Sequence, residues 1–387
     1  MKDTNKLKKA LIGALPRKIP GVMDVLGITP VLLRYIFKKY PERKPFCPLP
    51  FKHMEIMPGG GTNLCCYISK TPGRVSGNNL ERVYNSKSAR EIRESIINGS
   101  LEYCNLKACP HFTAGNLPSR SNCYGTAFEA IIDKKITFLE EINLWLSFDS
   151  RCNLTCVSCR NEPAAYTQKE QELVNSLMSE VLRNLPKISR LGLSGAGDPF
   201  ASPVFRKFLY EFDAARFPKL KIYLLANGLL FTEQAWGAMA KAQPAIRSVQ
   251  FSVDAATKET YEKIRRGGKF ETLTANLDHA ARLRKTGKIK ELIISFVINA
   301  FNFAEMPRFV EMGKALGCDQ VYFSCMMNWG ALSDEEYAKY AVHLPGHPRH
   351  KDFRGILNEK IFDDPVVLLG NVKQYRTSGI LRDSLFS

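Results

Sequence analysis

From about residue 142 onward, short apolar runs alternate regularly with longer amphipathic stretches. Six runs predict strands: INLWLSF, SRLGLSG, KIYLLAN, SVQFSVD, LIISFVIN and QVYFSC. The spacing of apolar residues between them predicts helices over 168–184, 203–214, 232–241, 257–264, 270–285 and 303–315. Six such units in series predict an α/β fold with parallel strands, either a partial barrel or an open doubly wound sheet. Both architectures place catalytic and ligand-binding side chains at the carboxyl ends of the strands.

The rest of the chain divides by composition. Residues 45–125 are rich in Gly, Pro, Asn and Cys, and their short apolar runs HMEIM and LCCYI predict a small β-rich unit with one helix over 86–98. We therefore expect four parts: a basic segment 1–44, a Cys-rich domain 45–125, a barrel 140–328 and an extension 329–387. The extension is expected to cover one mouth of the barrel or to shape the substrate pocket.

Composition and charge narrow the class of protein. The chain has 387 residues and 45% hydrophobic residues, with no apolar run of 18 or more and no secretory signal, so we expect a cytoplasmic protein. Residues 1–44 contribute +8 of the net charge of +17. Their stretches LKKALIGAL and VLLRYIFKKY would suit an anionic membrane surface, although a solvated tail or a packed helix is favoured. No nucleic-acid-binding signature accompanies the charge.

Three cysteines follow the first predicted strand. The text DSRCNLTCVSC places Cys152, Cys156 and Cys159 in a strand-end loop. A structural zinc site would need a fourth ligand, but the next histidine is His279 and the next cysteine is Cys318. Three thiolates can instead hold three irons of a [4Fe–4S] cluster and leave the fourth iron open to a small chelating molecule.

This loop resembles the hallmark Cys-x3-Cys-x2-Cys loop of the radical S-adenosylmethionine (radical SAM) superfamily. Later strand ends add to the resemblance. Gly195-Ala196-Gly197-Asp198-Pro199 is similar to the family's Gly-Gly-Glu-Pro turn, and Ala226-Asn227-Gly228 to its Thr-Asn-Gly. Ser252-Val253-Asp254-Ala255, continued by TKETYEKIRRGGKFE, resembles the subgroup that carries a SPASM domain. The resemblance implies a partial (β/α)6 TIM-like barrel that binds SAM at the open iron.

The resemblance also assigns contacts to SAM. Asp198 would accept from the ammonium group beside Gly195 and Gly197, and Arg265 would pair with the carboxylate. The ribose or the carboxylate would be held by Asn227, Ser252 and Asp254, and the adenine would be flanked near Val297 and Tyr322. Two positions depart from the family: Ser158 replaces a frequent aromatic residue, and Asp198 replaces Glu. Taken singly, Ser252 or Asp254 would cap a helix, and Arg265 would be a solvated charge.

A second group of cysteines precedes the barrel. The region resembles a SPASM or shortened "twitch" domain, which implies one auxiliary [4Fe–4S] cluster. The expected ligands are Cys47, Cys65, Cys104 and Cys109, with Cys66 as the alternative in the doublet and Cys123 as a possible extra ligand. A four-thiolate zinc site is the competing interpretation. We expect Cys318 and Cys325 to be ordinary buried residues, and Pro345 and Pro348 argue against a metal site at His343, His347 and His350.

The resemblance implies a radical SAM enzyme that cleaves SAM reductively and uses the 5′-deoxyadenosyl radical to abstract hydrogen from a substrate C–H bond. Peptide-modifying members of the family often carry a leader-binding module, for which the 44 N-terminal residues look too short, so we expect a sugar, a glycan precursor or a small metabolite rather than a peptide. An electron donor such as flavodoxin or ferredoxin is implied. The alternatives are a peptide- or protein-modifying radical SAM maturase and an iron–sulfur protein that transfers electrons without catalysis. The residues that act on the substrate are not predicted.

Overall fold

The computed structural model describes residues 46–376, apart from 78, 107, 114–116, 118–141, 161, 329 and 331. The basic segment 1–44 and Cys123 therefore lie outside the described residues. None of the described helices is long and apolar enough to cross a lipid bilayer.

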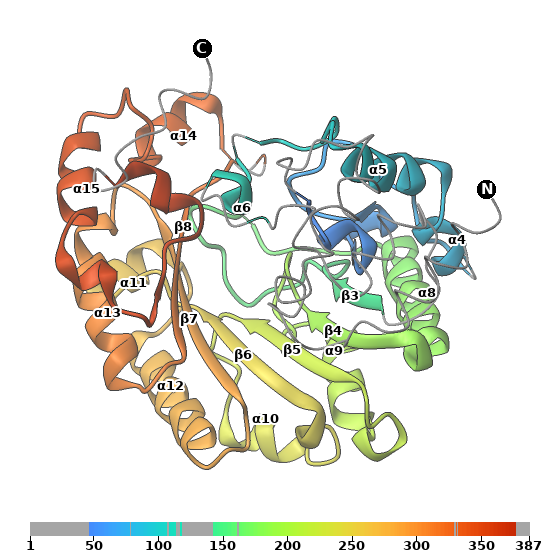
Figure 1. Cartoon of the computed structure of the whole chain (residues 1–387). Coiled ribbons are helices and arrows are strands. Elements are labelled where there is room, and N and C mark those ends of the chain that lie inside the picture. Colours follow the sequence, from blue (N-terminus) through green and yellow to red (C-terminus); the bar gives the residue numbers. More distant parts are fainter. Residues whose placement is uncertain are drawn as a thin grey trace, which may run out of the picture.

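One nine-stranded sheet forms the centre of the described chain (Figure 1). Its order is β2-β1-β3-β4-β5-β6-β7-β8-β9, and every neighbouring pair is parallel except β1 and β2. The strands are β1 (His53–Ile56), β2 (Thr62–Asn63), β3 (Ile142–Leu146), β4 (Ile188–Leu193), β5 (Lys221–Ala226), β6 (Ile246–Ser252), β7 (Glu291–Ile298), β8 (Gln320–Cys325) and β9 (Val367–Leu368). The six predicted strands are confirmed as β3 to β8, and the mostly parallel, open sheet agrees with a partial barrel.

Helices surround the outside of this sheet (Figure 1). They are α8 (Gln168–Asn184), α9 (Pro203–Glu211), α10 (Glu233–Ala238), α11 (Lys258–Ile264), α12 (Phe270–Lys285) and α13 (Met306–Ala315), close to the six predicted ranges. Their starts are set by sequence: Ser202, Thr232 and Thr257 each cap a helix with a side-chain oxygen. Thr167 and Glu170 form a capping box at α8.

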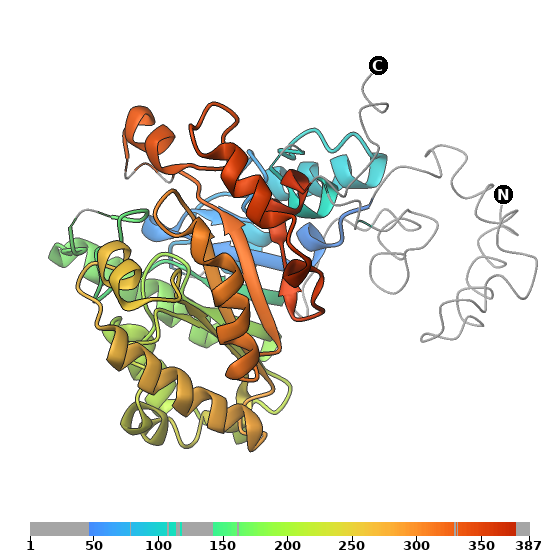
Figure 2. The same cartoon turned by 90° about the vertical axis from the view of Figure 1, so that its left-hand side faces the viewer.

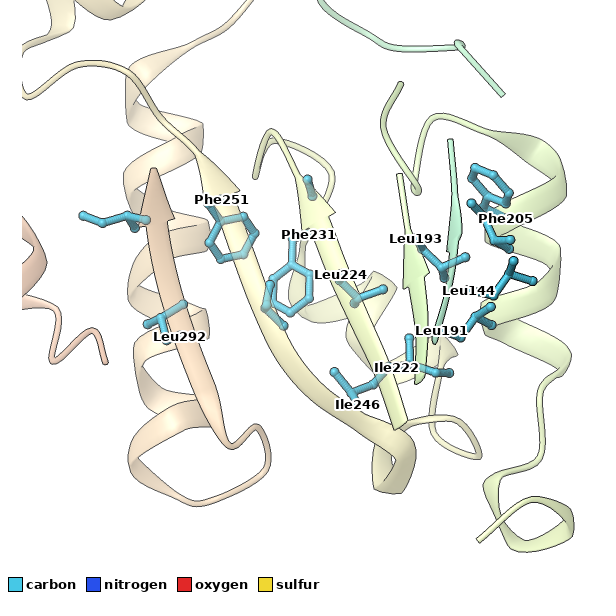
Figure 3. Packing of buried hydrophobic residues seen from close by; sticks show 14 of the residues in the cluster. Leu144, Leu191, Leu193, Phe205, Ile222, Leu224, Phe231, Ile246, Phe251 and Leu292 are labelled. Atoms are coloured by element: carbon cyan, nitrogen blue, oxygen red, sulfur yellow. The ribbon is translucent and has the colours of Figure 1, made fainter. Parts of the chain in front are cut away.

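The core lies between the strands and these helices. Alternate residues of β5 are buried, and Ile222 and Leu224 pack in the same cluster as Phe205 of α9 and Phe231 (Figure 3). The opposite face of the sheet carries larger polar and aromatic side chains. One row across it runs through Glu55, Trp145, Gly192 and Tyr223 on four neighbouring strands. Gly192 is required there, because a Cβ atom would lie 2.1 Å from the Trp145 ring.

The segment before the barrel shares its sheet. The predicted apolar run HMEIM forms β1, which pairs in parallel with β3 although about 90 residues separate them. The short β2 turns back beside it, and α4 (Leu80–Tyr84) and α5 (Lys87–Asn98) follow, the latter close to the predicted helix 86–98. Because β1 and β3 run in the same direction, the chain leaves both strands at the same edge of the sheet.

The C-terminal segment extends the other side of the sheet. It contains α14 (Asp334–Tyr340), α15 (His350–Leu357), the strand β9 beside β8, and a 3₁₀ helix at Gly370–Tyr375. The short helix α6 (Pro110–Thr113), from the Cys-rich segment, contacts this 3₁₀ helix, and Figure 2 shows the two parts of the chain close together. The Cys-rich segment therefore contacts both sides of the open sheet.

Candidate functional site

The cysteine loop lies at the carboxyl end of β3, as predicted, and is fixed by a distant segment. The backbone N–H groups of Thr155 and Val157 donate to the carbonyl oxygens of Arg266 and Ile264, at 3.1 Å and 3.0 Å. Arg266 Nε donates in return to Thr155 O at 2.7 Å. The TYEKIRRGG text therefore contributes directly to the loop's position, which explains why both features occur in one chain.

Each of the three loop sulfurs accepts a side-chain N–H donor. Arg265 Nη1 lies 3.4 Å from Cys156 Sγ, Asn227 Nδ2 lies 3.6 Å from Cys152 Sγ, and Arg160 Nη2 lies 3.5 Å from Cys159 Sγ. Two of these donors are guanidinium groups, and cations favour the thiolate form of a cysteine. Cys156 is buried, whereas Cys159 is exposed. The loop therefore presents three sulfurs of graded exposure, each with a side-chain N–H donor, while burial raises the pKa of Cys152.

Arg265 is the most constrained of these donors. Its Nη2 lies 2.6 Å from Asp254 Oδ2, and both side chains are almost completely buried. Burial disfavours the Arg265 cation, but Asp254 and Cys156 outweigh that effect and raise its pKa. Burial also raises the pKa of Asp254, against the opposing effect of Arg265. Arg265 Nε is buried without a hydrogen-bond partner. One donor of this guanidinium is therefore still available to a ligand acceptor such as a carboxylate.

Asp198, a predicted ammonium acceptor, is occupied by the protein backbone. Its Oδ2 accepts from Asn227 N at 2.8 Å, and its Oδ1 accepts from Phe200 N at 2.9 Å and Ala201 N at 3.2 Å. Burial raises the pKa of Asp198, although these N–H groups oppose the shift. Asp198 therefore ties the ends of β4 and β5 together. Its contact with an ammonium group stays a prediction.

The glycines of the predicted turn lie against the cysteine loop. A Cβ atom at Gly197 would come within 2.5 Å of the carbonyl oxygens of Asp149 and Arg151, and one at Gly195 within 2.3 Å of Ser147 Oγ. Ser194, just before the turn, has a φ of 76°. Only glycine fits these close approaches, so the turn is shaped by its contact with the loop.

A small pocket opens beside the loop at the ends of β6 and β7. It is lined by Val157, Ser158, Asp254, Ile264, Asn299, Phe301, Met326 and Tyr340. Asp254 has a φ of 64° there, and its Oδ1 accepts from Val297 N at 2.8 Å. Left-handed backbone at a non-glycine residue is uncommon and is often found at ligand sites. The structure thus brings Ser158, Asp254 and the neighbourhood of Val297 together. Ser252 ends β6 and is partly buried, while Tyr322 lies further along the sheet on β8.

The second group of cysteines lies in the Cys-rich segment that precedes β3. Cys47, Cys65, Cys104 and Cys109 are close enough for Cys47 to interact electrostatically with the other three. Burial raises the pKa of Cys47 to about 12 and that of Cys104 to about 11. A hydrogen bond with Cys66 lowers the pKa of Cys65 to about 7, and Tyr67 N donates to Cys65 Sγ at 3.4 Å. These four thiols are the ones predicted as auxiliary ligands.

The described residues contain no group of three or more His, Cys, Asp or Glu side chains converging on a single metal ion. Cys318 and Cys325 are buried, as predicted. In the C-terminal segment, His347 Nε2 and His350 Nδ1 lie 3.0 Å and 3.2 Å from backbone carbonyl oxygens. The His343 ring is packed between Tyr337 and Tyr375. These three rings therefore pack and bond within the C-terminal segment.

Sequence reasoning missed two contributors to the site. Arg160 directly follows Cys159, and besides that sulfur it donates to Ser150 O and Ala196 O, which link the loop to the Gly turn. Its place next to the third cysteine was the only sequence signal. Glu55 accepts from Ser147 Oγ across 92 positions of sequence. No local pattern connects Glu55 with the loop, because the contact depends on the parallel pairing of β1 with β3.

Comparison with known proteins relates part of this chain to one superfamily. Residues 146–313 match the model of the Radical SAM superfamily. A GTP 3′,8-cyclase from Desulforamulus reducens is 27% identical over 43% of this chain and 50% of its own length, and one from Clostridium acetobutylicum is 27% identical over 45% and 52%. The solved structure of native anSMEcpe with bound AdoMet and Kp18Cys peptide shares 19% identity over 57% of this chain and 59% of its own, with a TM-score of 0.40. This chain spans about half the length of the two cyclases.

Proposed function

Because residues 146–313 match the model of the Radical SAM superfamily, we propose that this protein is an enzyme that cleaves SAM reductively and abstracts hydrogen from a substrate C–H bond. Cys152, Cys156 and Cys159 would hold three irons of a [4Fe–4S] cluster. When bound, such a cluster supplies the electron that splits SAM into methionine and a 5′-deoxyadenosyl radical. The observation that carries this proposal is the side-chain N–H donor at each of the three sulfurs.

The donor set fits an iron–sulfur cluster better than a single metal ion. Each thiolate of a [4Fe–4S] cluster binds a different iron, so the sulfurs need not converge on one point. Hydrogen bonds to the sulfurs are one of the means by which a protein sets the potential of such a cluster. Arg265, Asn227 and Arg160 provide these bonds here. Their rigidity follows from burial of Arg265 and from the carbonyl contacts of Arg160.

The residues around the loop fit the amino acid and nucleoside parts of SAM. The free Nε–H of buried Arg265 supports pairing with the carboxylate. The pocket beside Ser158, Asp254 and Asn299 supports a nucleoside position there. In this proposal Arg265 orients the amino acid end, and Phe301 and Met326 exclude water from the nucleoside. Asn227 and Ser252 contribute polar groups at neighbouring strand ends.

We extend the proposal to the second cysteine group as an auxiliary [4Fe–4S] site. Mutual electrostatic interaction of Cys47, Cys65, Cys104 and Cys109 supports a shared ligand. A four-thiolate zinc site remains the competing assignment because sulfur tetrads serve both metals. Iron and zinc content of the purified chain separates them: two [4Fe–4S] clusters correspond to about eight irons per chain, and one cluster with zinc to about four.

A small molecule is the proposed substrate class, in line with a sugar, glycan precursor or metabolite. The two cyclases are named for a reaction on a nucleotide, which supports a small molecule over a peptide. An external one-electron donor of the flavodoxin or ferredoxin type would reduce the protein. The competing function, electron transfer without catalysis, predicts that SAM is not consumed.

The experiment that tests the proposal measures 5′-deoxyadenosine. Anaerobically reconstituted protein is reduced with dithionite, given SAM and analysed by liquid chromatography. We expect 5′-deoxyadenosine from the wild type and from Cys318→Ala, a buried cysteine away from the loop, and none above background from Cys156→Ala. Wild-type protein that takes up iron but forms no 5′-deoxyadenosine or adduct of it would overturn the proposal in favour of electron transfer.

A further inference from the structure

Two polar atoms near the cysteine loop are buried and have no hydrogen-bond partner in the described part of the chain. They are Nε of Arg265 and the hydroxyl oxygen of Tyr261 on α11, and Tyr261 is 0% exposed. An unpaired buried hydroxyl is rare, because it has lost its hydrogen bonds to water and gained none in exchange. The proposed SAM contacts use Arg265 Nε and leave the Tyr261 hydroxyl unexplained.

Tyr261 belongs to a buried group of side chains behind Cys156. It lies one helical turn before Arg265, whose backbone N–H donates to Tyr261 O at 2.8 Å. The Arg265 side chain donates to Cys156 Sγ at 3.4 Å and pairs with Asp254. Tyr261 is close enough to interact electrostatically with both Arg265 and Cys156. The unpaired hydroxyl therefore shares its buried surroundings with a sulfur of the cysteine loop.

The position of the Tyr261 hydroxyl is fixed by the packing around its ring. A Cβ atom at Gly268 would lie 2.8 Å from Tyr261 Cε1 and 2.9 Å from the hydroxyl oxygen, so only glycine fits there. The ring also packs against Phe270, with 5.6 Å between the ring centroids. The hydroxyl oxygen lies on the axis of the ring, so flipping of the ring does not move it. It therefore stays among these buried groups.

Metal binding at the loop would change the charge of this buried group. While Cys156 is a neutral thiol, the charges of Arg265 and Asp254 compensate each other. A metal-bound cysteine is a thiolate, so it brings in a negative sulfur that accepts hydrogen bonds more strongly than a thiol does. Burial raises the pKa of Tyr261, so its hydroxyl keeps the proton that it would donate. The unpaired hydroxyl is therefore a donor for which a bound Cys156 thiolate would be the acceptor.

We infer that Tyr261 is a positioning residue for the loop cluster, and that its hydroxyl donates to Cys156 Sγ once this sulfur is a metal-bound thiolate. The identity of the metal group rests on the proposed function. The Cys156 sulfur would then have two donors, the Tyr261 hydroxyl and Arg265 Nη1. Both would stabilise the reduced cluster, which is the more negative state, and the hydroxyl would also orient the sulfur. Because the bond forms on metal binding, its removal should affect the loaded chain and spare the metal-free chain.

The test compares Tyr261→Phe with the wild type in the full chain, both metal-free and after anaerobic reconstitution. Phenylalanine keeps the ring and removes only the hydroxyl. Tyr84→Phe is the matched control, because Tyr84 on α4 is also buried but its hydroxyl donates to Phe51 O at 3.0 Å. The control therefore loses a hydrogen bond that exists with or without metal.

The first arm measures urea unfolding of the metal-free chains. Tyr261→Phe should unfold at the same urea concentration as the wild type or at a higher one, since the unpaired hydroxyl contributes no hydrogen bond. Tyr84→Phe should unfold at a lower concentration. A decrease for Tyr261→Phe as large as that for Tyr84→Phe would show that the hydroxyl already has a partner, such as a buried water, and would overturn the inference.

The second arm measures the potential of the loop cluster by redox titration and electron paramagnetic resonance, with Cys104→Ala in every chain to remove the proposed second cluster. Tyr261→Phe should lower the equilibrium constant for reduction about 2- to 10-fold, the range of one hydrogen bond, which makes the potential more negative by about 20–60 mV. Tyr84→Phe should leave the potential unchanged. An unchanged potential in Tyr261→Phe would overturn the inference alone. A parent chain that forms no [4Fe–4S] cluster would overturn the proposed function, and the inference with it.

Discussion

The two cysteine groups belong to different parts of the chain, and they differ in the hydrogen-bond donors around their sulfurs. The three loop sulfurs each accept a side-chain N–H, two of them from arginine. In the Cys-rich segment, burial raises the pKa of Cys47 to about 12 and that of Cys104 to about 11, whereas a hydrogen bond with Cys66 lowers the pKa of Cys65 to about 7. Burial also raises the pKa of Cys152 in the loop. What separates the two groups is therefore the set of fixed side-chain N–H donors at the loop sulfurs, which favour bound thiolates once a metal has displaced their protons.

This difference indicates that the loop cysteines, and not the second group, are arranged for a reaction. Fixed donors at the loop sulfurs would affect the potential of a bound cluster, and a small pocket adjoins the loop. In the proposed assignment the second group offers four thiols to one cluster, which would leave no open coordination position on that cluster. We therefore expect the loop to carry the reaction with SAM and the second group to have a supporting role, with changes at the two sites affecting different measurements.

The largest expected effect comes from removing one cysteine at each site. Cys156→Ala should lower 5′-deoxyadenosine formation by at least about 1,000-fold, because catalysis at the cluster is lost entirely. Cys104→Ala should still cleave SAM and lose only the second spectroscopic signal. Iron analysis and electron paramagnetic resonance of both variants check this contrast. Equal loss of SAM cleavage in the two variants would remove the distinction between the sites.

A smaller effect is expected for the buried pair behind the loop. Arg265→Met leaves Asp254 buried without its cation, which should lower the free energy of unfolding by about 3–5 kcal/mol. The double variant Arg265→Met with Asp254→Asn should recover part of that loss, since no unpaired charge remains. Urea denaturation of the metal-free chains measures both. If the double variant is no more stable than the single one, the buried charge is not the cause.

Helix caps in the two regions test whether they fold together. Ser86 caps α5 in the Cys-rich segment, and Thr167 caps α8 in the segment that matches the Radical SAM model. Replacing either by Ala should cost about 1 kcal/mol. Because β1 pairs with β3 in one sheet, both changes should shift the same single unfolding transition. Two separate transitions, each sensitive to only one of the caps, would show that the segments unfold independently.

The smallest effect concerns the potential of the loop cluster. Arg160→Gln removes a cation that donates to Cys159 Sγ. The reduced cluster is the more negative state, so the potential should become more negative by roughly 10–40 mV, equivalent to a few tenths to about 1 kcal/mol for one electron. A redox titration followed by electron paramagnetic resonance measures the shift. The second cluster should keep its potential, and a common shift of both would argue against a local effect.

The periodicity of apolar residues was sufficient to predict the barrel strands, because the residues that determine each strand lie close together in the sequence. The strands β3 to β8 and the cap residues Ser202, Thr232 and Thr257 are readable within windows of about ten residues. The strands β1 and β9 were not placed in this sheet from sequence. β1 pairs with a strand about 90 residues away, and β9 has two residues, too few for a pattern. Their pairing depends on tertiary packing.

Sequence reasoning predicted the site residues that follow strand ends. It missed the residues whose contacts cross from one strand of the sheet to another. Asp254 and Arg265 were named separately, but their pairing with each other depends on the fold that brings α11 to β6. Glu55 had no sequence signal at all. For Asp198 the turn motif indicated the position but not the hydrogen bonds. Backbone N–H groups already occupy both of its carboxylate oxygens, which only the structure shows.

The most direct measurement of the central claim is electron paramagnetic resonance of the dithionite-reduced Cys104→Ala chain, in which only the loop cluster remains, recorded with and without SAM. An iron that lacks a protein ligand and binds SAM should give a spectrum whose g values shift when SAM is added. Superimposable spectra at saturating SAM would mean that the loop cluster offers no coordination position to the nucleoside, and would contradict the account.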